Sequence, residues 1–369
     1  MPAEKTVATT ATAAAGRPWY KNPVVLGAVA AAVVVIVLVI ALPVSLVKKG
    51  HSNSNSGSGT GDMAPHSSPL NGLISQACGT HRATGFSNDF TNQSLVSGDY
   101  TRNYSINVPA SYNDNNTRPW PVIIDYHGNS RNGTDQYNNS MFYAYPAGQE
   151  YIAVYPEGVN NSWQGPSYAI AGVDDLQFTT DLLAHLNTTY CIDHTRIYAS
   201  GKSNGAGFVD TLACSDNGDA FAAFAMASAA LYTDTSRDSC NKSRAVLESH
   251  GKADTTIPYD PTKPGKGGEL PPIRSWVKWW SERNGCASSD VAAEMQKDGY
   301  DVFDYDCRGA NSTVHYAVED LGHCWPSGNG ENFDARTTAE GKCEDRSLDF
   351  TPVVLEFFGR WHLGNAPRN

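Results

Sequence analysis

The segment that decides the fold spans residues 196–213 and reads RIYASGKSNGAGFVDTLA. Its first four residues form a short β-branched and aromatic run typical of a strand, whereas 206–213 has the composition of a helix. Gly201 and Gly205 flank Ser203 in a G-x-S-x-G pattern. A serine on so tight a strand-to-helix turn has a strained backbone, so the residues two positions away must be very small. We therefore expect Ser203 to stand at a sharp turn, with its hydroxyl raised clear of a sheet.

Outside this segment, short apolar runs rich in β-branched residues alternate with segments of helical spacing. This alternation is typical of a parallel sheet flanked by helices. We therefore predict an α/β fold with a mostly parallel central sheet. Strands are predicted at 104–108, 121–126, 151–155, 196–199, 222–226, 245–249 and 313–317, and helices at 178–190, 272–284 and 351–363.

A nucleophilic serine at such a turn needs a general base, which is expected later in the chain. The sequence has ten histidines. His315 lies inside a predicted strand and His362 near the end of the last predicted helix, so both are interpreted as packing or surface residues. His323 stands in the loop LGHCWP after a predicted strand, where an imidazole can reach a serine. We predict that His323 is the base.

The acid that orients this imidazole is expected between the serine and the histidine. The predicted strand 245–249 runs directly into the residues HGKAD, which places Asp254 in a loop at the carboxyl edge of the sheet. Asp260, in a proline-rich loop, and Asp320, near the end of its own strand, remain alternatives. A loop aspartate more commonly caps a turn. The strand-end position and the chain order favour Asp254.

Two backbone amides are expected to stabilise the oxyanion that forms when the serine attacks. The first is the N–H of Asn204, at the N-terminus of the following helix. The second should come from the loop after an early strand, and the strand 121–126 is followed by HGNS. Gly128 lets the backbone approach a ligand, so the N–H of Asn129 or of Ser130 is predicted as this donor. The histidine of this loop is interpreted as structural.

The N-terminal part of the chain has a different composition. Residues 24–47 form an apolar stretch without a charged side chain, long enough as a helix to cross the ~30 Å hydrocarbon core of a bilayer. We predict a transmembrane signal anchor there, with a cytoplasmic tail at 1–23, a flexible Ser/Gly/Asn linker at 48–69 and one catalytic domain at 70–369. A cleaved signal peptide, whose apolar region is usually about 7–15 residues long, is the alternative.

Cysteines, sequons and charge indicate the compartment and the partners. Eight cysteines and a set of N-glycosylation sequons all lie beyond the apolar stretch, which fits disulfides in an oxidising compartment better than a metal site. The net charge of −11 and the lack of a basic cluster exclude nucleic acid as a partner. Closure of short loops favours the pairs Cys214–Cys240 and Cys286–Cys307. The partners of the other cysteines stay open: Cys78, Cys191, Cys324 and Cys343.

Eight motifs between about Leu70 and Leu363 are specific in combination: HG at 127–128, SWQG at 162–165, VDD at 173–175, GKSNG at 201–205, LAC at 212–214, HGKAD at 250–254, NGC at 284–286 and GHCWP at 322–326. Together they resemble the secreted feruloyl esterases and polyhydroxybutyrate depolymerase-like esterases of carbohydrate esterase family one. The resemblance implies an α/β-hydrolase fold and a triad of Ser203, Asp254 and His323. It also favours the Cys286–Cys307 disulfide, and it implies no metal ion and no organic cofactor.

The function that this resemblance implies is a serine carboxylic-ester hydrolase. Specifically, it implies a feruloyl esterase that releases hydroxycinnamic acids from plant cell-wall polysaccharide through an acyl-enzyme. Acetylxylan esterase and polyhydroxyalkanoate depolymerase are alternatives within the same chemistry. An inactive glycan-binding ectodomain is the non-enzymatic alternative, and the intact serine–aspartate–histidine order argues against it. The expected partners are an ester substrate and, through residues 24–47, a membrane, with the catalytic domain facing outward.

Overall fold

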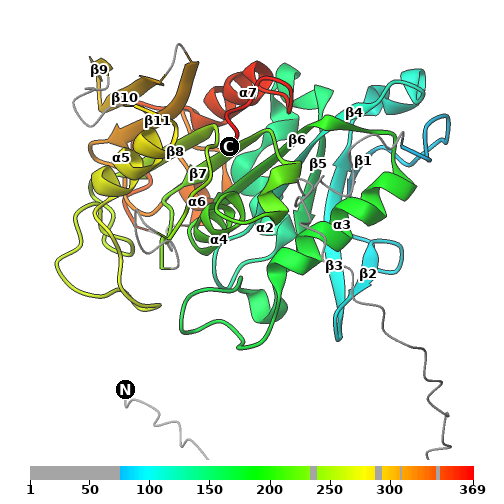
Figure 1. The fold of residues 1–369 in the computed structure, drawn as a ribbon, viewed down its shortest axis with the longest axis horizontal. Coiled ribbons are helices and arrows are strands. Elements are labelled where there is room, and N and C mark those ends of the chain that lie inside the picture. Colours follow the sequence, from blue (N-terminus) through cyan, green and yellow to red (C-terminus); the bar gives the residue numbers. More distant parts are fainter. Residues whose placement is uncertain (1–74, 233–238, 287–292, 308–309, 338–340) are drawn as a thin grey trace, which may run out of the picture. The chain divides into compact units, whose positions relative to one another are not determined.

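The computed structural model describes residues 75–369, apart from 233–238, 287–292, 308–309 and 338–340 (Figure 1). The chain divides into two units, Met1–Ala64 and Pro65–Asn369. The predicted cytoplasmic tail, membrane anchor and linker lie outside the described residues. Within the described ranges, no helix is both long enough and apolar enough to cross a membrane.

The strands of the second unit belong to one 11-stranded arrangement that runs through the middle of Figure 1. They include every strand that the sequence predicts, together with several shorter or more polar ones. The strands are β1 (Gly85–Ser87), β2 (Ser94–Ser97), β3 (Tyr100–Val108), β4 (Trp120–Tyr126), β5 (Ile152–Pro156), β6 (Ile192–Lys202), β7 (Ala223–Ala227), β8 (Val246–Gly251), β9 (Ala293–Lys297), β10 (Tyr300–Cys307) and β11 (Ala310–Val318).

The order of the strands is β1-β3-β5-β4-β6-β7-β8-β11-β10-β9, with β2 paired to β3 beside this path. All neighbours from β5 to β11 are parallel. The pairs at the two ends of the sheet are antiparallel. The predicted mostly parallel central sheet is therefore confirmed. Its parallel strands all bring their carboxyl ends to one edge, which is where ligand sites form in open α/β sheets.

Helices connect these strands and cover both faces of the sheet (Figure 1). The three predicted helices are present with boundaries shifted by one to three residues. The α-helices are α2 (Gly133–Ser140), α3 (Asp175–Thr189), α4 (Asn204–Ala213), α5 (Ile273–Arg283), α6 (Phe333–Thr337) and α7 (Phe350–Arg360). Short 3₁₀ turns are η2 (Ala110–Asn115), η3 (Phe142–Ala144), η4 (Pro146–Glu150), η5 (Val159–Asn161) and η6 (Asn217–Ala220).

The sheet separates two hydrophobic cores. On β4, Val122 and Ile124 face one core, whereas Ile123 between them faces the other, because successive side chains of a strand point to opposite faces. The first core is completed by α3, α4 and α5, and the second by α7. Both faces of the central strands are thus covered, and this explains why these strands read as continuous apolar runs.

In the described part of the chain, disulfides join Cys78 to Cys191, Cys214 to Cys240 and Cys324 to Cys343. The structure forms the predicted local pair of Cys214 and Cys240 at the end of α4. Cys286 is also disulfide-bonded, and its pairing with Cys307 stays a prediction. These bonds fit an oxidising compartment.

Candidate active site

The turn between β6 and α4 holds Ser203 in a strained conformation. Its backbone dihedrals, φ of 57° and ψ of −120°, lie in a region that residues other than glycine rarely adopt. A Cβ on Gly205 would collide with the carbonyl oxygen of Tyr126 on β4, and one on Gly201 would lie 2.7 Å from the carbonyl carbon of Gly205. Both glycines of the motif are therefore required by close backbone approach. This geometry matches the sharp turn that the sequence predicts.

His323 lies between the other two predicted triad residues. Its Nε2 atom is 2.7 Å from Ser203 Oγ, and its Nδ1 atom is 2.7 Å from Asp254 Oδ2. An ionised carboxylate can only accept a hydrogen bond, so Nδ1 carries the proton and Nε2 is left to accept from the serine hydroxyl. The three residues are almost completely buried, with exposed fractions of 9% for Ser203, 2% for His323 and 4% for Asp254. The arrangement can move a proton from the serine to the imidazole.

The carboxylate of Asp254 is held on both oxygens. Oδ1 accepts hydrogen bonds from the backbone N–H groups of Thr256 and Ile257, each at 2.8 Å. Burial by itself raises the pKa of Asp254, but the charges and hydrogen bonds of His323 and His250 outweigh burial and hold this pKa well below its usual range. The group is therefore ionised throughout the range in which an esterase works.

The alternatives left open by the sequence lie elsewhere. Asp260 and Asp320 are exposed, and neither has a hydrogen bond to an imidazole in the described part of the chain. His315 is a buried residue of β11, as its strand-like surroundings predict. His362 is exposed just beyond α7. The structure thus brings Asp254 and His323, and none of these alternatives, to Ser203.

The loop that carries His323 is fixed on both sides of the imidazole. Gly322 donates its N–H to the Lys342 carbonyl at 2.9 Å, and Cys324 is bonded to Cys343. The N–H of Trp325 donates to Asp334 of α6 at 2.8 Å. The ring is therefore positioned by a covalent bond and backbone hydrogen bonds within three residues of it.

The predicted oxyanion donors occupy two loops beside Ser203. A Cβ on Gly128 would lie 3.4 Å from Ser203 Cβ, so this loop passes directly against the serine. The Ser130 N–H donates a hydrogen bond to the Asn161 carbonyl at 2.8 Å. Within the described ranges the Asn129 N–H has no acceptor, and neither has the Asn204 N–H at the start of α4. Of the two alternatives in this loop, the geometry therefore favours Asn129 as the second donor.

Two buried side chains that the sequence analysis leaves without a site role join these loops. Trp163 donates its backbone N–H to Asn204 Oδ1 at 2.8 Å and its indole N–H to the His127 carbonyl at 2.9 Å. His127 accepts the Gly158 N–H on Nε2 at 3.0 Å, so its Nδ1 proton lies toward the Gly128 carbonyl at 2.8 Å. Burial lowers the pKa of His127 to about 4, so the ring is neutral. His127 joins the loop after β4 to Gly158 and Trp163 by hydrogen bonds.

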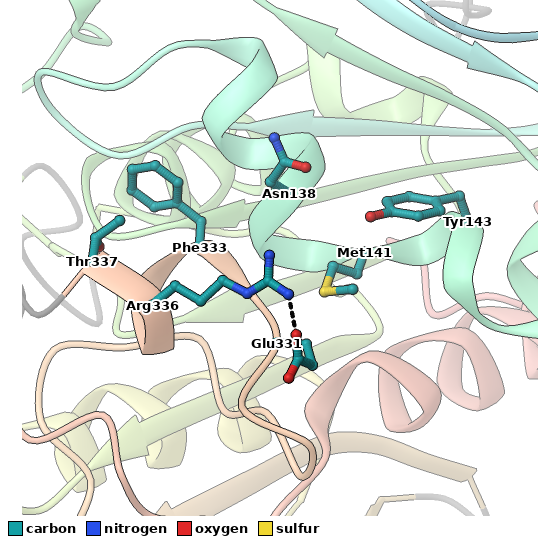
Figure 2. A pocket seen from close by; sticks show the side chains of 7 residues that line it. All are labelled: Asn138, Met141, Tyr143, Glu331, Phe333, Arg336 and Thr337. Carbon is teal, nitrogen blue, oxygen red and sulfur yellow. Dashed lines mark hydrogen bonds and ion pairs between the residues drawn. The ribbon is translucent and has the colours of Figure 1, made fainter.

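A hollow of about 350 Å³ lies beside this site, between the end of α2 and α6. Figure 2 shows the Arg336 side chain reaching across it to pair with Glu331. Phe333 also lines a second, much smaller cavity that reaches Gly128 and Lys202, the neighbour of Ser203. The hollow therefore lies on the α6 side of the serine turn. Its lining residues are Asn138, Met141, Tyr143, Glu331, Phe333, Arg336 and Thr337.

Comparisons with known proteins identify related sequences. No family model matches the chain. A probable feruloyl esterase C of Aspergillus terreus is 26% identical over 261 residues, which cover 69% of this chain and 86% of the relative. A protein of the same name from Aspergillus niger is 25% identical, over 60% of this chain and 76% of the relative. Feruloyl esterase D of Neurospora crassa is 29% identical over 126 residues, or 31% of this chain and 41% of the relative.

Solved structures with a similar backbone include esterases. An acetyl xylan esterase from Aspergillus awamori has 15% identity and a TM-score of 0.45, covering 66% of this chain and 94% of its own. A thermostable esterase has 16% identity and a TM-score of 0.47, and the match covers 73% of this chain and 62% of that esterase. The resemblance that the motifs predict is confirmed by the sequence relatives. The chain is a feruloyl esterase-like α/β-hydrolase and a carboxylic ester hydrolase.

Proposed function

We propose that Ser203, His323 and Asp254 form the catalytic triad of this esterase. The observation that carries the proposal is the His323 ring, which contacts Ser203 Oγ and Asp254 Oδ2 at 2.7 Å each. Ser203 Oγ attacks the ester carbonyl carbon while its proton passes to His323 Nε2. Asp254 stabilises the imidazolium that forms, and the N–H groups of Asn204 and Asn129 stabilise the oxyanion.

The tetrahedral intermediate then collapses to an acyl-enzyme. The bond between the carbonyl carbon and the alcohol oxygen breaks, and His323 returns its proton to the departing alcohol. A water molecule next gives its proton to His323 while its oxygen attacks the acyl carbon, and the bond to Ser203 Oγ breaks. The carboxylic acid leaves and the serine regains its proton. No step requires a metal or an organic cofactor.

The substrate we propose is a hydroxycinnamoyl ester on plant cell-wall polysaccharide. Support comes from the relatives, which are named feruloyl esterases. The test is a comparison of kcat/KM on feruloylated arabinoxylan, acetylated xylan and hydroxybutyrate oligomers, with Ser203→Ala as the inactive control. We expect the highest value for release of ferulate. Preferred release of acetate or hydroxybutyrate would replace this substrate by one of the two alternatives while retaining the chemistry.

The hollow between α2 and α6 is the place we assign to the sugar part of this substrate. Aromatic rings that line it (Tyr143 and Phe333) can stack on a sugar ring, while its Asn138, Glu331 and Arg336 offer hydrogen-bonding groups. Phe333→Ala should then raise KM for feruloylated arabinoxylan several-fold and leave KM for methyl ferulate unchanged. An equal change on both substrates would remove the hollow from substrate binding.

The location we propose is the outer face of a membrane, with residues 24–47 as the anchor, 1–23 as the tail and 48–69 as the linker. The charge-free composition of 24–47 supports this placement, and the disulfides support an oxidising compartment. The full-length protein should sediment with membranes and resist carbonate extraction. A soluble product whose N-terminus begins after Lys49 would instead identify a cleaved signal peptide.

A further inference from the structure

A line of buried polar side chains extends from the triad into the sheet on the side away from Ser203. His250 Nε2 lies 3.4 Å from Asp254 Oδ2, on the oxygen that also contacts His323. His250 Nδ1 lies 2.9 Å from Glu248 Oε1. The other oxygen of Glu248, Oε2, is 2.6 Å from His315 Nδ1. The side chains of Glu248, His250 and His315 are each at most 1% exposed.

The sheet itself places these side chains together. Glu248 and His250 are two residues apart on β8, so they point to the same face. His315 is the residue of β11 directly opposite Glu248 in the parallel pairing. Asp254 follows three residues after the end of β8. The cluster is therefore set by strand register and does not depend on a flexible loop.

The hydrogen bonds fix where the protons lie. His250 Nε2 is 2.8 Å from the Ile257 carbonyl, which can only accept, so Nε2 carries a proton. An ionised Glu248 can only accept as well, so Nδ1 of His250 carries the second proton. His315 Nε2 contacts the Tyr259 hydroxyl at 2.8 Å. The hydroxyl can donate there, so His315 can stay neutral although its Nδ1 lies 2.6 Å from Glu248 Oε2.

The electrostatic surroundings agree with an ionised pair. Burial opposes the charge on His250, but Asp254 and Glu248 outweigh it and raise the pKa of His250 to about 10. Burial likewise opposes ionisation of Glu248, but the contacts with His250 and His315 lower the pKa of Glu248 below its ordinary value. Arg274 also acts on His315, and it lies over the Phe303 ring that stacks on His315.

We propose that His250 is a permanently charged imidazolium that positions Asp254 and weakens its hold on the proton of His323. This role rests on the proposed function, because it acts through the triad. An aspartate without a second cation would stabilise protonated His323 more strongly, and the enzyme would then lose its neutral base at a higher pH. With His250 charged, we expect the esterase to stay active under more acidic conditions than with a neutral residue at that position.

The test compares the pH dependence of kcat/KM, measured with p-nitrophenyl acetate, for the wild type, His250→Gln and Glu248→Gln. The first variant removes the cation but keeps a donor, and the second removes Glu248, one of the two carboxylates that keep His250 charged. We expect the acid limb of the His250→Gln profile to move to higher pH by roughly one unit, as for the loss of one nearby buried charge. The limb of Glu248→Gln should move in the same direction by less, because loss of the Glu248 anion partly offsets loss of the charge on His250. A loss of kcat with an unmoved acid limb in both variants would overturn the proposal and leave His250 a packing residue.

A matched control is Asp210→Asn. Asp210 is a buried carboxylate of α4 that accepts hydrogen bonds from the indole N–H groups of Trp276 and Trp280 at 3.1 and 2.9 Å, and it has no contact with His250 or Asp254 in the described structure. The asparagine oxygen can accept the same bonds. The acid limb of Asp210→Asn should coincide with that of the wild type. An equal shift in this control would mean that any buried charge moves the limb, and would overturn the specific role of His250.

The charge of His250 can also be measured without activity. Nitrogen-15 NMR distinguishes an imidazolium, in which both ring nitrogens are protonated, from a neutral ring. At pH 8 in the full-length protein, we expect one imidazolium signal that is missing from His250→Gln. A neutral His250 at that pH would overturn the proposal even if every variant folds. If instead no ester is hydrolysed but the imidazolium is present, the proposed function fails while the charge assignment stands.

Discussion

At pH 6, two buried carboxyl groups on one sheet are in opposite states of ionisation. Asp125 of β4 is fully buried, and both its oxygens accept from Gln136 Nε2 at 3.0 Å. Burial raises the pKa of Asp125 to about 7, because its partners are neutral amide and hydroxyl groups. Glu248 of β8 is equally buried, but it lies between two imidazoles and its pKa is lowered. The partners, and not burial alone, decide the charge of a carboxyl group in this core.

The difference in charge between Asp125 and Glu248 matters for catalysis because the two acids lie beside different parts of the site. Asp125 lies two residues before His127, at the root of the loop that carries the proposed oxyanion donor Asn129. A negative charge there would oppose the oxyanion. Glu248 contacts His250, and its charge helps to keep His250 protonated. Below pH 7, the neutral acid thus lies at the root of the loop with the proposed oxyanion donor, and the ionised acid contacts the His250 cation.

The largest effect is expected on kcat, when the triad acid Asp254 and the buried acid Asp125 are each replaced by the corresponding amide. Asp254→Asn should lower kcat by about 10⁴-fold, because the amide favours the wrong tautomer of His323. Asp125→Asn should stay within a few-fold of the wild type at pH 6, because a protonated acid and an amide are both neutral. Esterase assays on p-nitrophenyl acetate distinguish these results.

The matching control for this experiment is Ser203→Ala, which should lose kcat by several orders of magnitude. Near-wild-type activity of Ser203→Ala would remove Ser203 from the mechanism. A large loss of kcat in Asp125→Asn would contradict the idea that this acid is neutral in the active enzyme.

The second largest effect concerns stability at pH 6. Glu248→Gln removes the anion between His250 and His315. Removal of one partner of a buried ion pair costs about 3–5 kcal/mol of unfolding free energy. Asp125→Asn should cost about 1 kcal/mol or less, since a neutral hydrogen-bonding group is retained. Urea unfolding followed by tryptophan fluorescence measures both. Equal losses would show that the two acids carry the same charge in the folded protein.

The third prediction concerns the pH dependence of that stability. The folded pKa of Asp125, about 7, is above its reference value of 3.8, so its contribution is fully present below about pH 4 and is lost as pH rises through 7. Asp125→Asn lacks this loss. Its stability relative to the wild type should therefore rise by about 2–4 kcal/mol between pH 4 and pH 8. A constant difference across this range would place the folded pKa of Asp125 near its unfolded value.

The smallest effect is expected at the far end of the cluster. His315→Gln keeps a side-chain donor for Glu248 and leaves the contact between Glu248 and His250 in place. We expect kcat within about tenfold of the wild type and a shift of the acid limb well below that of His250→Gln. A shift as large as that of His250→Gln would mean that His315, and not His250, holds the charge that acts on the triad.

The sequence allowed prediction of the parts of the site that depend on local order. Ser203 is marked by two glycines that the tight turn requires, and Asp254 and His323 each follow a predicted strand. The parallel sheet was also predictable, because its apolar strands and amphipathic helices alternate along the chain. These signals come from neighbours in sequence.

The parts that escaped prediction depend on register and on tertiary contacts. His315 was recognised as a strand residue, but its pairing with Glu248 is fixed by the register of two strands more than sixty residues apart. One signal in the sequence points to this cluster: Glu248 and His250 are charged or polar residues two positions apart in an otherwise apolar strand. Trp163 reaches Asn204 only through folding of a long loop. The short strands β1 and β2 have little apolar periodicity, and the segment of β10 is rich in aspartate.

The bond between Cys324 and Cys343 has a consequence for when the enzyme becomes competent. It joins the residue after His323 to a segment nineteen positions further along, so the base is held in place by a link that forms only after thiols are oxidised. A chain newly made in a reducing cytosol has the serine and the aspartate but not this link. We therefore expect the protein to acquire full esterase activity during export. The immature chain should then hydrolyse few esters inside the cell.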